Sequence, residues 1–263
     1  MPGNEIEITK YLVRNKGMFS LHHLNTVISV GAPSPEPAHY IELNNLSDIE
    51  RNLAPEEAGK KADIYINGHG VSLKQSGANF SYNRLQRANL IDVFNSLNLS
   101  NSNSILKRLD QEVEMFHTGQ LDRRNRPWNS FFEESEFKKL IKFLMMEGSP
   151  NEGVSSHPAK FILEAPSINI SADNINIYTF DEYFDKYKEN FKIAIRRQWI
   201  GQASNSEHTR AVGLAKKPDN APWVFNNVVG EPNMHRVTNR RWRADTPKGK
   251  RKTVYFLMLE KEA

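Results

Sequence analysis

The chain has 263 residues, of which 38% are hydrophobic and 25% are charged. This mixture is typical of a folded globular protein, and the length suits one domain or one domain with a subdomain. No apolar stretch approaches the ~20 residues of a membrane span, and no apolar signal core opens the chain, so we expect a cytoplasmic protein without a membrane partner. Cysteine is absent, which excludes disulfides and thiolate zinc sites.

The first half of the chain predicts short helices mixed with short strands. The apolar residues after a possible cap at Asn4 mix helical and strand spacing, and we interpret them as a helix. A wide apolar face after Tyr82 favours another helix. Alternating or continuous apolar runs beside Pro/Gly-rich turns favour strands. Helices are expected over 4–13, over 47–53 with Ser47 as the cap, over 82–97 and over 104–116, and strands over 24–30 and 39–43, with a turn over 31–37.

The second half changes character after a helix that is expected over 131–146. Short β-like runs separated by turn residues make it strand-rich, with one acidic aromatic helix over 181–190. We therefore expect a mixed α/β (α+β) fold, with a central mixed sheet, flanking helices and no sharp domain boundary. Strands are expected over 160–165, 175–180, 192–199, 223–228, 235–242 and 253–259.

One short hairpin is expected around the sequence Asn67-Gly68-His69-Gly70. A two-residue turn at Gly68-His69 sets Asp63 opposite Lys74, whereas a turn at Asn67-Gly68 sets Asp63 opposite Ser72. Since side chains alternate along a strand, both registers place Asp63, Ser72 and Lys74 on one face. The opposite face is then apolar and consists of Ile64, Ile66, Val71 and Leu73.

A carboxylate, a hydroxyl and an ammonium on one patch suit metal-assisted hydrolysis of a phosphodiester. The carboxylate, helped by a main-chain carbonyl, would hold Mg²⁺, and the lysine would orient or deprotonate a water. The alternative is an ordinary edge ribbon with a surface Asp–Lys pair, which contributes at most about 1 kcal/mol to stability. Both readings remain open at this point.

Asp63 followed by Ser72-Leu73-Lys74 resembles the PD-(D/E)xK nuclease motif, in the variant of several type II restriction endonucleases where a small polar residue replaces the middle acid. Ala62 stands where that motif has proline. The resemblance implies a restriction-endonuclease-like core that binds Mg²⁺ through Asp63 and the carbonyl of Leu73. It further implies Lys74 as the catalytic lysine, Ser72 in the place of the acid, and Glu5, on the first helix, as a supporting acid.

The same resemblance implies one endonuclease domain over 1–263, with a catalytic core over about 1–120 and a DNA-recognition portion over 120–263. Its substrate would be double-stranded DNA, and symmetric cutting of a palindrome would imply a homodimer by analogy. Two rival functions remain: a non-catalytic sequence-specific DNA-binding protein, and a repair or RNA-processing nuclease with the same core.

Positive charge is concentrated in two stretches of the sequence, which are the candidate DNA-binding segments. The stretch RVTNRRWRADTPKGKRK (236–252) has a single acid, Asp245, and a second basic group lies at 123–126. A basic two-stranded ribbon fits the major groove, and arginine is the preferred partner of guanine, although charge runs are also commonly just solvated faces. The candidate DNA-binding residues are Gln75, Arg84, Arg123, Arg124, Arg126, Arg236, Asn239, Arg240, Arg241, Arg243, Lys248, Lys250, Arg251 and Lys252.

The histidines predict no zinc site. They show neither HxxxH nor HExxH spacing. Asp181, Glu182 and Asp185 alternate with aromatic residues, a pattern that favours an amphipathic helix over a second metal site.

Overall fold

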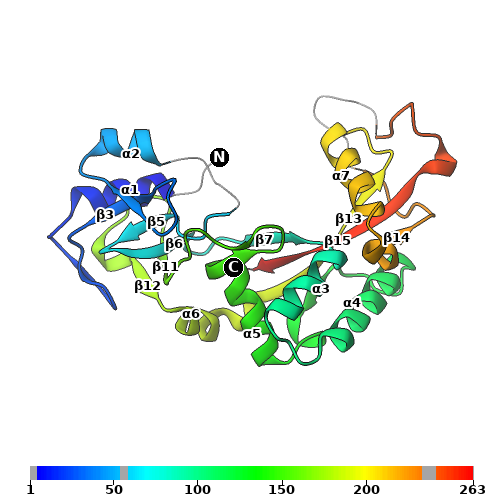
Figure 1. Ribbon diagram of the computed structural model, residues 1–263, viewed down its shortest axis with the longest axis horizontal. Coiled ribbons are helices and arrows are strands. Elements are labelled where there is room, and N and C mark those ends of the chain that lie inside the picture. The colour runs from blue at the N-terminus through cyan, green and yellow to red at the C-terminus, as the bar shows by residue number, and fades with distance from the viewer. Residues whose placement is uncertain (1–4, 54–58, 233–240, 263) are drawn as a thin grey trace. The chain divides into compact units, whose positions relative to one another are not determined.

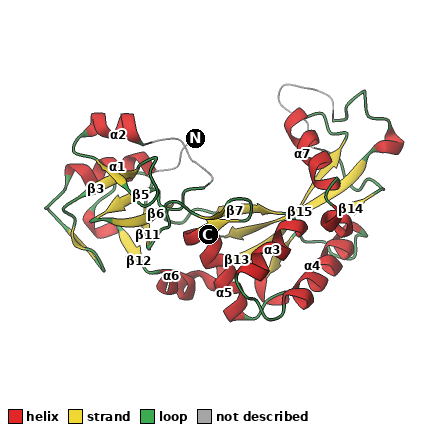
Figure 2. Cartoon of the chain, in the orientation of Figure 1, coloured by secondary structure: helices red, strands yellow, loops and turns green. Residues whose placement is uncertain are grey.

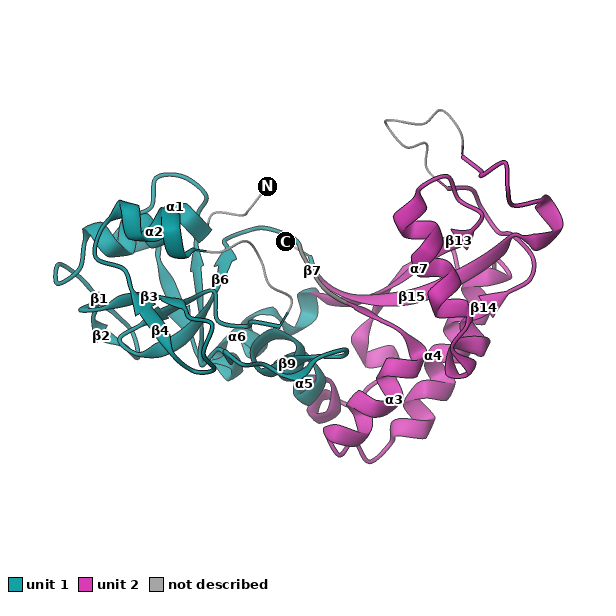
Figure 3. Ribbon diagram, turned by 45° about the horizontal axis from the view of Figure 1, so that its top comes forward, with its two compact units in different colours: residues 1–80, 138–190, 261–263 teal, residues 81–137, 191–260 magenta. Residues whose placement is uncertain are grey.

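The computed structural model describes residues 5–53, 59–232 and 241–262. The chain forms two compact units: unit 1 comprises residues 1–80, 138–190 and 261–263, and unit 2 comprises residues 81–137 and 191–260 (Figure 3). These segments interleave along the chain, whereas the expected portions 1–120 and 120–263 are contiguous. The described residues form a mixed α/β fold with a large mixed sheet, which confirms the predicted fold class (Figures 1 and 2).

Helices and strands are interspersed along the described residues. The α-helices are α1 (Glu5–Arg14), α2 (Leu46–Asn52), α3 (Arg87–Ser96), α4 (Ser102–His117), α5 (Glu134–Lys142), α6 (Phe180–Tyr187) and α7 (Asn205–Ala215). The strands are β1 (Ser20–Leu21), β2 (Asn25–Thr26), β3 (Val30–Pro33), β4 (Tyr40–Glu42), β5 (Ile64–Ile66), β6 (His69–Gln75), β7 (Phe80–Leu85), β8 (Asn125–Pro127), β9 (Gly148–Ser149), β10 (Gly153–Val154), β11 (Phe161–Ala165), β12 (Asn176–Tyr178), β13 (Phe191–Ile200), β14 (Val224–Phe225) and β15 (Lys252–Lys261).

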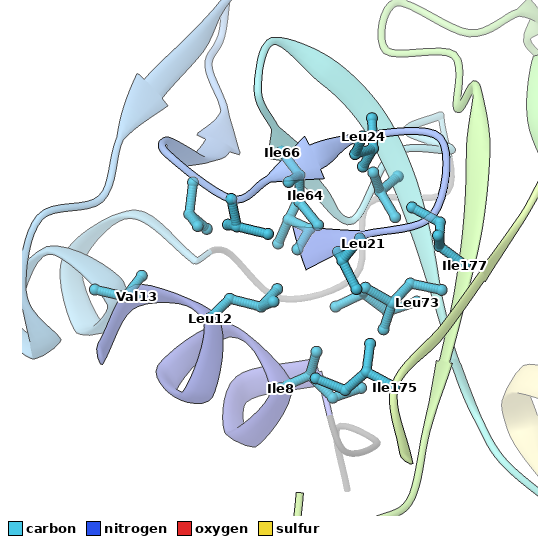
Figure 4. Close-up of a cluster of buried hydrophobic side chains, with 14 of the residues drawn as sticks. Ile8, Leu12, Val13, Leu21, Leu24, Ile64, Ile66, Leu73, Ile175 and Ile177 are labelled. Carbon is cyan, nitrogen blue, oxygen red and sulfur yellow. The ribbon is translucent and has the colours of Figure 1, made fainter. Parts of the chain in front are cut away.

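Unit 1 is built on a six-stranded sheet in the order β12-β11-β6-β5-β3-β4. Strand β11 runs parallel to β6, and the other neighbouring pairs are antiparallel. One face of this sheet is apolar and packs against α1 and the segment 21–27, as Figure 4 shows. Its core includes Ile8, Leu12, Leu21, Leu24, Ile64, Ile66, Val71, Leu73, Phe161, Ile175 and Ile177.

The hairpin β5–β6 adopts the second of the two predicted registers. Ile64 pairs with Val71 and Ile66 with His69, so the turn consists of Asn67 and Gly68. Both residues have positive φ, 50° and 79°, as a type I′ turn requires. The Asn67 side chain also accepts the amide hydrogens of Ile28 and Ser29, at 2.9 and 3.1 Å. The turn residues therefore fix both the register of the hairpin and its place beside β3.

Unit 2 contains a five-stranded sheet in the order β14-β15-β13-β8, in which β7 also pairs with β15. Helix α7 packs Ala211 and Leu214 against Val254 of β15. Helix α3 packs against α4.

Several predicted elements are wrong in type or position. Residues 80–85 form a strand, β7, and the helix predicted over 82–97 begins only at Arg87. The strand predicted over 24–30 is replaced by β2 and β3, so part of the predicted Pro/Gly-rich turn belongs to a strand. Helix α2 is capped by Asn45, which accepts the amide hydrogen of Asp48, and not by Ser47. The predicted cap Asn4 and most of the predicted strand 235–242 lie outside the described residues.

The long helices expected over 104–116 and 181–190, and the strands expected over 160–165, 175–180, 192–199 and 253–259, are confirmed with shifts of a few residues at their ends. Among the described helices, none combines the length and the apolar character that a membrane crossing requires.

Candidate functional site

Asp63, Ser72 and Lys74 lie together on the face of the sheet opposite the apolar core. The hydroxyl of Ser72 donates to Asp63 Oδ2 at 3.2 Å, and the ammonium of Lys74 donates to Ser72 Oγ at 2.7 Å. Lys74 Nζ also donates to the carbonyl oxygen of Leu73 at 3.0 Å and lies 4.0 Å from Asp63 Oδ2. The sequence-based prediction that these groups cluster is confirmed by this geometry.

The local fold explains why the cluster forms. Asp63 precedes β5 and continues its pairing, since its amide donates to the carbonyl of Val71 at 3.0 Å. Its carboxylate in turn accepts the amide hydrogen of Leu73 at 2.6 Å, while the Leu73 side chain is buried in the core on the other face. Because side chains alternate along β6, Leu73 points into the apolar core, whereas Ser72 and Lys74 lie on the opposite face of the sheet.

The cluster combines a buried hydroxyl with two partly exposed charged groups. Ser72 is only 2% exposed, whereas the side chains of Asp63 and Lys74 are 25% and 16% exposed. Half-buried charges interact more strongly than fully hydrated ones, and they remain within reach of a substrate. The carboxylate and the ammonium are therefore placed for chemistry at the surface of the sheet.

The available donor atoms fit a hard divalent cation. Asp63 Oδ2 accepts hydrogen bonds from Leu73 and Ser72, whereas Oδ1 receives none from the residues that the structure describes. Mg²⁺ prefers oxygen ligands and is commonly bound by one or two carboxylates together with substrate phosphates and water. Asp63 Oδ1 and the carbonyl of Leu73 supply such oxygens, and Ser72 supplies a neutral hydroxyl where an acid would add a second charge.

Lys61 interacts electrostatically with Asp63 and Lys74, and the sequence reasoning did not single it out. Burial and the nearby ammonium of Lys74 lower its pKa, while Glu152 and Asp63 act in the opposite direction. Lys61 precedes β5 and lies outside any strand, and the amides of Lys61 and Ala62 both donate to the carbonyl of His157, at 3.0 and 2.8 Å. Strand alternation therefore could not have identified it.

Glu5 opens helix α1, whose buried residues Ile8 and Leu12 pack on the apolar face of the sheet. Its proposed role as a supporting acid stays a prediction.

The candidate DNA-binding residues divide between the two units. Gln75 ends β6 in unit 1, whereas Arg84, Arg123, Arg124, Arg126, Arg241, Arg243, Lys248, Lys250, Arg251 and Lys252 belong to unit 2. Arg236, Asn239 and Arg240 lie outside the described residues.

Many of the unit 2 arginines already have partners within the chain. Arg126 pairs with Glu112 at 2.7 Å, Arg84 pairs with Glu207 at 3.4 Å, Arg241 pairs with Glu231, and the guanidinium of Arg251 lies over the ring of Trp242 at 4.5 Å. Arg243 binds both oxygens of Asp245, and its hydrogen bonds lower the pKa of that carboxyl to about 2. These contacts reduce the charge that such arginines present to a polyanion.

A smaller set of cations has exposed side chains without a partner among the described residues. Arg123 and Arg124 lie in the loop before β8, and Lys248 and Lys250 lie in a short 3-10 helix. Because such side chains keep their full charge for a polyanion, they are the clearest phosphate-binding candidates.

The described part of the basic stretch 236–252 does not form the predicted two-stranded ribbon. Residues 241–250 form turns and a 3-10 helix, in which Trp242 makes an isolated bridge to Gln202. The strand that follows, β15, pairs within the sheet of unit 2 with β14, β13 and β7. In the described residues, the basic stretch therefore leads into strand β15 of a sheet and does not form a free hairpin.

The site thus rests on its own geometry. Neither a family model, nor a curated protein, nor a solved structure shows a significant match to this chain.

Proposed function

We propose that the chain is a Mg²⁺-dependent endonuclease that hydrolyses phosphodiester bonds in double-stranded DNA, in the manner of type II restriction enzymes. The observation that supports this proposal is the convergence of the Asp63 carboxylate, the Leu73 carbonyl and the Lys74 ammonium on one accessible face, with 3.0 Å between Lys74 Nζ and the carbonyl oxygen. An ordinary surface ion pair does not need the buried hydroxyl of Ser72 between its charges.

Each residue has a separate role in the proposed reaction. Asp63 Oδ1 and the carbonyl oxygen of Leu73 would hold Mg²⁺, which when bound would polarise the phosphate and acidify a water. Lys74, whose ammonium donates to Ser72 Oγ, would orient that water. Only after losing a proton could its neutral amine accept the proton of that water. Lys61 would face the phosphate and offset the negative charge that develops on its oxygens.

The exposed cations of unit 2 that have no partner among the described residues support DNA as the substrate. Arg123, Arg124, Lys248 and Lys250 would contact the phosphate backbone, which is the main source of affinity and carries no sequence information.

The test is digestion of a defined supercoiled plasmid by the purified chain, with Mg²⁺ or with a chelator. We expect discrete fragments with Mg²⁺ and none with the chelator. The variants Asp63→Asn and Lys74→Met should produce no fragments. The matched control is Lys10→Met, which removes a lysine that is also paired with an acid, Glu7 at 2.8 Å, but on helix α1. Full cleavage by the Asp63 and Lys74 variants would rule out this site.

The same assay distinguishes the rival functions. A retarded but intact plasmid, with or without Mg²⁺, would indicate a DNA-binding protein. Degradation without fixed fragment ends, or preference for RNA, would indicate a repair or RNA-processing nuclease built on the same residues.

A further inference from the structure

A second group of metal-ligating side chains lies in unit 1, outside the proposed nuclease site. It consists of His22 and His23, in the turn between β1 and β2, and Glu182, in the first turn of α6. One ligand atom from each of the three residues lies within 4.8 Å of the other two. The closest pair is His23 Nε2 with the two carboxylate oxygens of Glu182, at 2.8 and 3.1 Å.

These spacings are close to those of a bound ion. Zinc lies about 2.0–2.2 Å from imidazole nitrogen and carboxylate oxygen, so two ligands on one ion are roughly 3–3.5 Å apart. His23 Nε2 lies 3.1 Å from Glu182 Oε1, within this range, and a ligand atom of His22 lies within 4.8 Å of both residues. The three side chains therefore lie close to the spacing of a three-ligand site.

The three residues are exposed, and contacts to neighbouring residues hold His23 and Glu182 in place. The ring of His23 stacks on Phe161, with 5.8 Å between centroids and 15° between planes, and the ring of His22 lies 4.0 Å from that of His23. Glu182 accepts the amide and hydroxyl hydrogens of Thr179 at 2.7 and 2.9 Å, as the cap of α6. The Thr179 amide first, and then His23, lower the pKa of Glu182 to about 2, so its carboxylate is charged at neutral pH.

A pocket of 370 Å³ adjoins the group and is lined by His22 and Glu182 together with residues of β1 and β12. Strand β12 forms one edge of the six-stranded sheet, and β11 and β6 separate it from β5. The pocket offers room for a water or a small ligand in a fourth coordination position.

We propose that His22, His23 and Glu182 bind a transition-metal dication of the zinc class, which ties the turn after β1 to the start of α6. Two imidazoles and one carboxylate are a donor set that zinc uses, with water in the open position, whereas Mg²⁺ selects oxygen ligands. The zinc site does not depend on the nuclease proposal, because its ligands do not include Asp63, Ser72 or Lys74.

The experiment is equilibrium dialysis of the metal-free full chain against Zn²⁺, with Co²⁺ absorption as a second readout of the ligand geometry. The wild type should bind one Zn²⁺ per chain, and its melting temperature should rise with Zn²⁺, since an ion that binds only the folded state stabilises it. The variants are His22→Ala, His23→Asn and Glu182→Gln. Asparagine suits His23 because that residue has a positive φ of 65°, and glutamine retains the cap of α6.

All three variants should lose the Zn²⁺ binding and the thermal shift while remaining folded by circular dichroism. The matched control is His39→Ala, which removes a different exposed histidine that lies 3.2 Å from a carboxylate, that of Glu36. The control and Asp63→Asn should both bind Zn²⁺ as the wild type does. A wild type without stoichiometric Zn²⁺, or equal binding by His23→Asn, would overturn the proposal whatever the outcome of the plasmid assay.

Discussion

Replacing Asp63 separates its structural contribution from its proposed role in metal binding. Asp63 Oδ2 accepts the amide hydrogen of Leu73 at 2.6 Å, and Leu73 is 3% exposed. In Asp63→Ala this buried amide loses its acceptor. A buried donor left without a partner costs about 1–3 kcal/mol, and a hydrogen bond to a charged group contributes about 1.5–3 kcal/mol. We expect Asp63→Ala to lower the free energy of unfolding of unit 1 by about 2 kcal/mol.

Asp63→Asn retains a side-chain oxygen that can accept the same amide, so its loss of stability should be clearly smaller. With a urea slope of about 1–3 kcal/mol/M, a loss of about 2 kcal/mol moves the unfolding midpoint by about 0.7–2 M. Both variants should nevertheless lose Mg²⁺-dependent cleavage, because neither carries the negative charge of the carboxylate.

The assay must report on unit 1. All tryptophans of the chain (Trp128, Trp199, Trp223 and Trp242) belong to unit 2, so tryptophan fluorescence would follow the wrong part. Far-UV circular dichroism in urea, combined with hydrogen exchange of the peptide that contains Leu73, reports on the hairpin itself. A wild-type midpoint and wild-type exchange in Asp63→Ala would refute the argument from the Leu73 amide, and cleavage by Asp63→Asn would refute the metal-binding role.

Three further outcomes are expected. In Gly70→Ala the new methyl group would overlap the carbonyl oxygen of Pro158, so thermal melts should show a loss of about 1–3 kcal/mol, and unchanged stability would contradict this packing. In the double variant Arg123→Ala/Arg124→Ala, anisotropy titrations with duplex DNA should give weaker binding and a salt slope smaller by up to about 2, or about 0.9 per lost phosphate contact, and an unchanged slope would exclude these contacts. The pKa of Glu182 is lowered from 4.5 to about 2, so its stabilising effect is complete above pH 4.5 and disappears as the pH falls toward 2. Melts of Glu182→Gln against pH should therefore show a difference from the wild type that is largest near neutral pH and vanishes near pH 2, and a constant difference would count against the charged cap.

The hairpin could be predicted because its determinants are local. Asn67-Gly68 supplies the positive φ values of a type I′ turn, and the alternation of apolar and polar residues on each side assigns the two faces. The choice between the two registers was open in the sequence, since Gly68-His69 also suits a turn. Contacts from Asn67 to the distant segment 28–29 favour the observed one.

The errors arose where distant parts of the chain decide the structure. Leu85 fits the apolar face of the predicted helix, but it is buried in a strand whose partner, β15, lies far along the chain. The approach of Glu182 to His22 and His23 could not be predicted either, because the fold brings together residues that are distant in sequence. Lys61 could not be grouped with Asp63 and Lys74 by alternation, because it lies before β5 in a segment that contacts His157, far along the chain.

The number of basic residues in a stretch does not show which of them are free to bind phosphate. The sequence gives no means of separating Arg124, which has no partner in the described structure, from Arg126, which is paired with Glu112. Ion pairing depends on tertiary packing, and therefore only the structure ranks these residues as ligands for phosphate.

The parallel pairing of β6 with β11 has a consequence for synthesis of the chain on the ribosome. The hairpin that carries Lys74 is complete by residue 75, but its neighbour in the sheet spans Phe161–Ala165, and the intervening residues 81–137 belong to the other unit. Translation at roughly 5–20 residues per second leaves several seconds between the two strands. During that time β6 has an unprotected hydrogen-bonding edge, which another nascent chain could pair with. A ribosome-bound chain stalled before residue 161 should therefore be prone to aggregation and depend on chaperones, although its hairpin residues are all present.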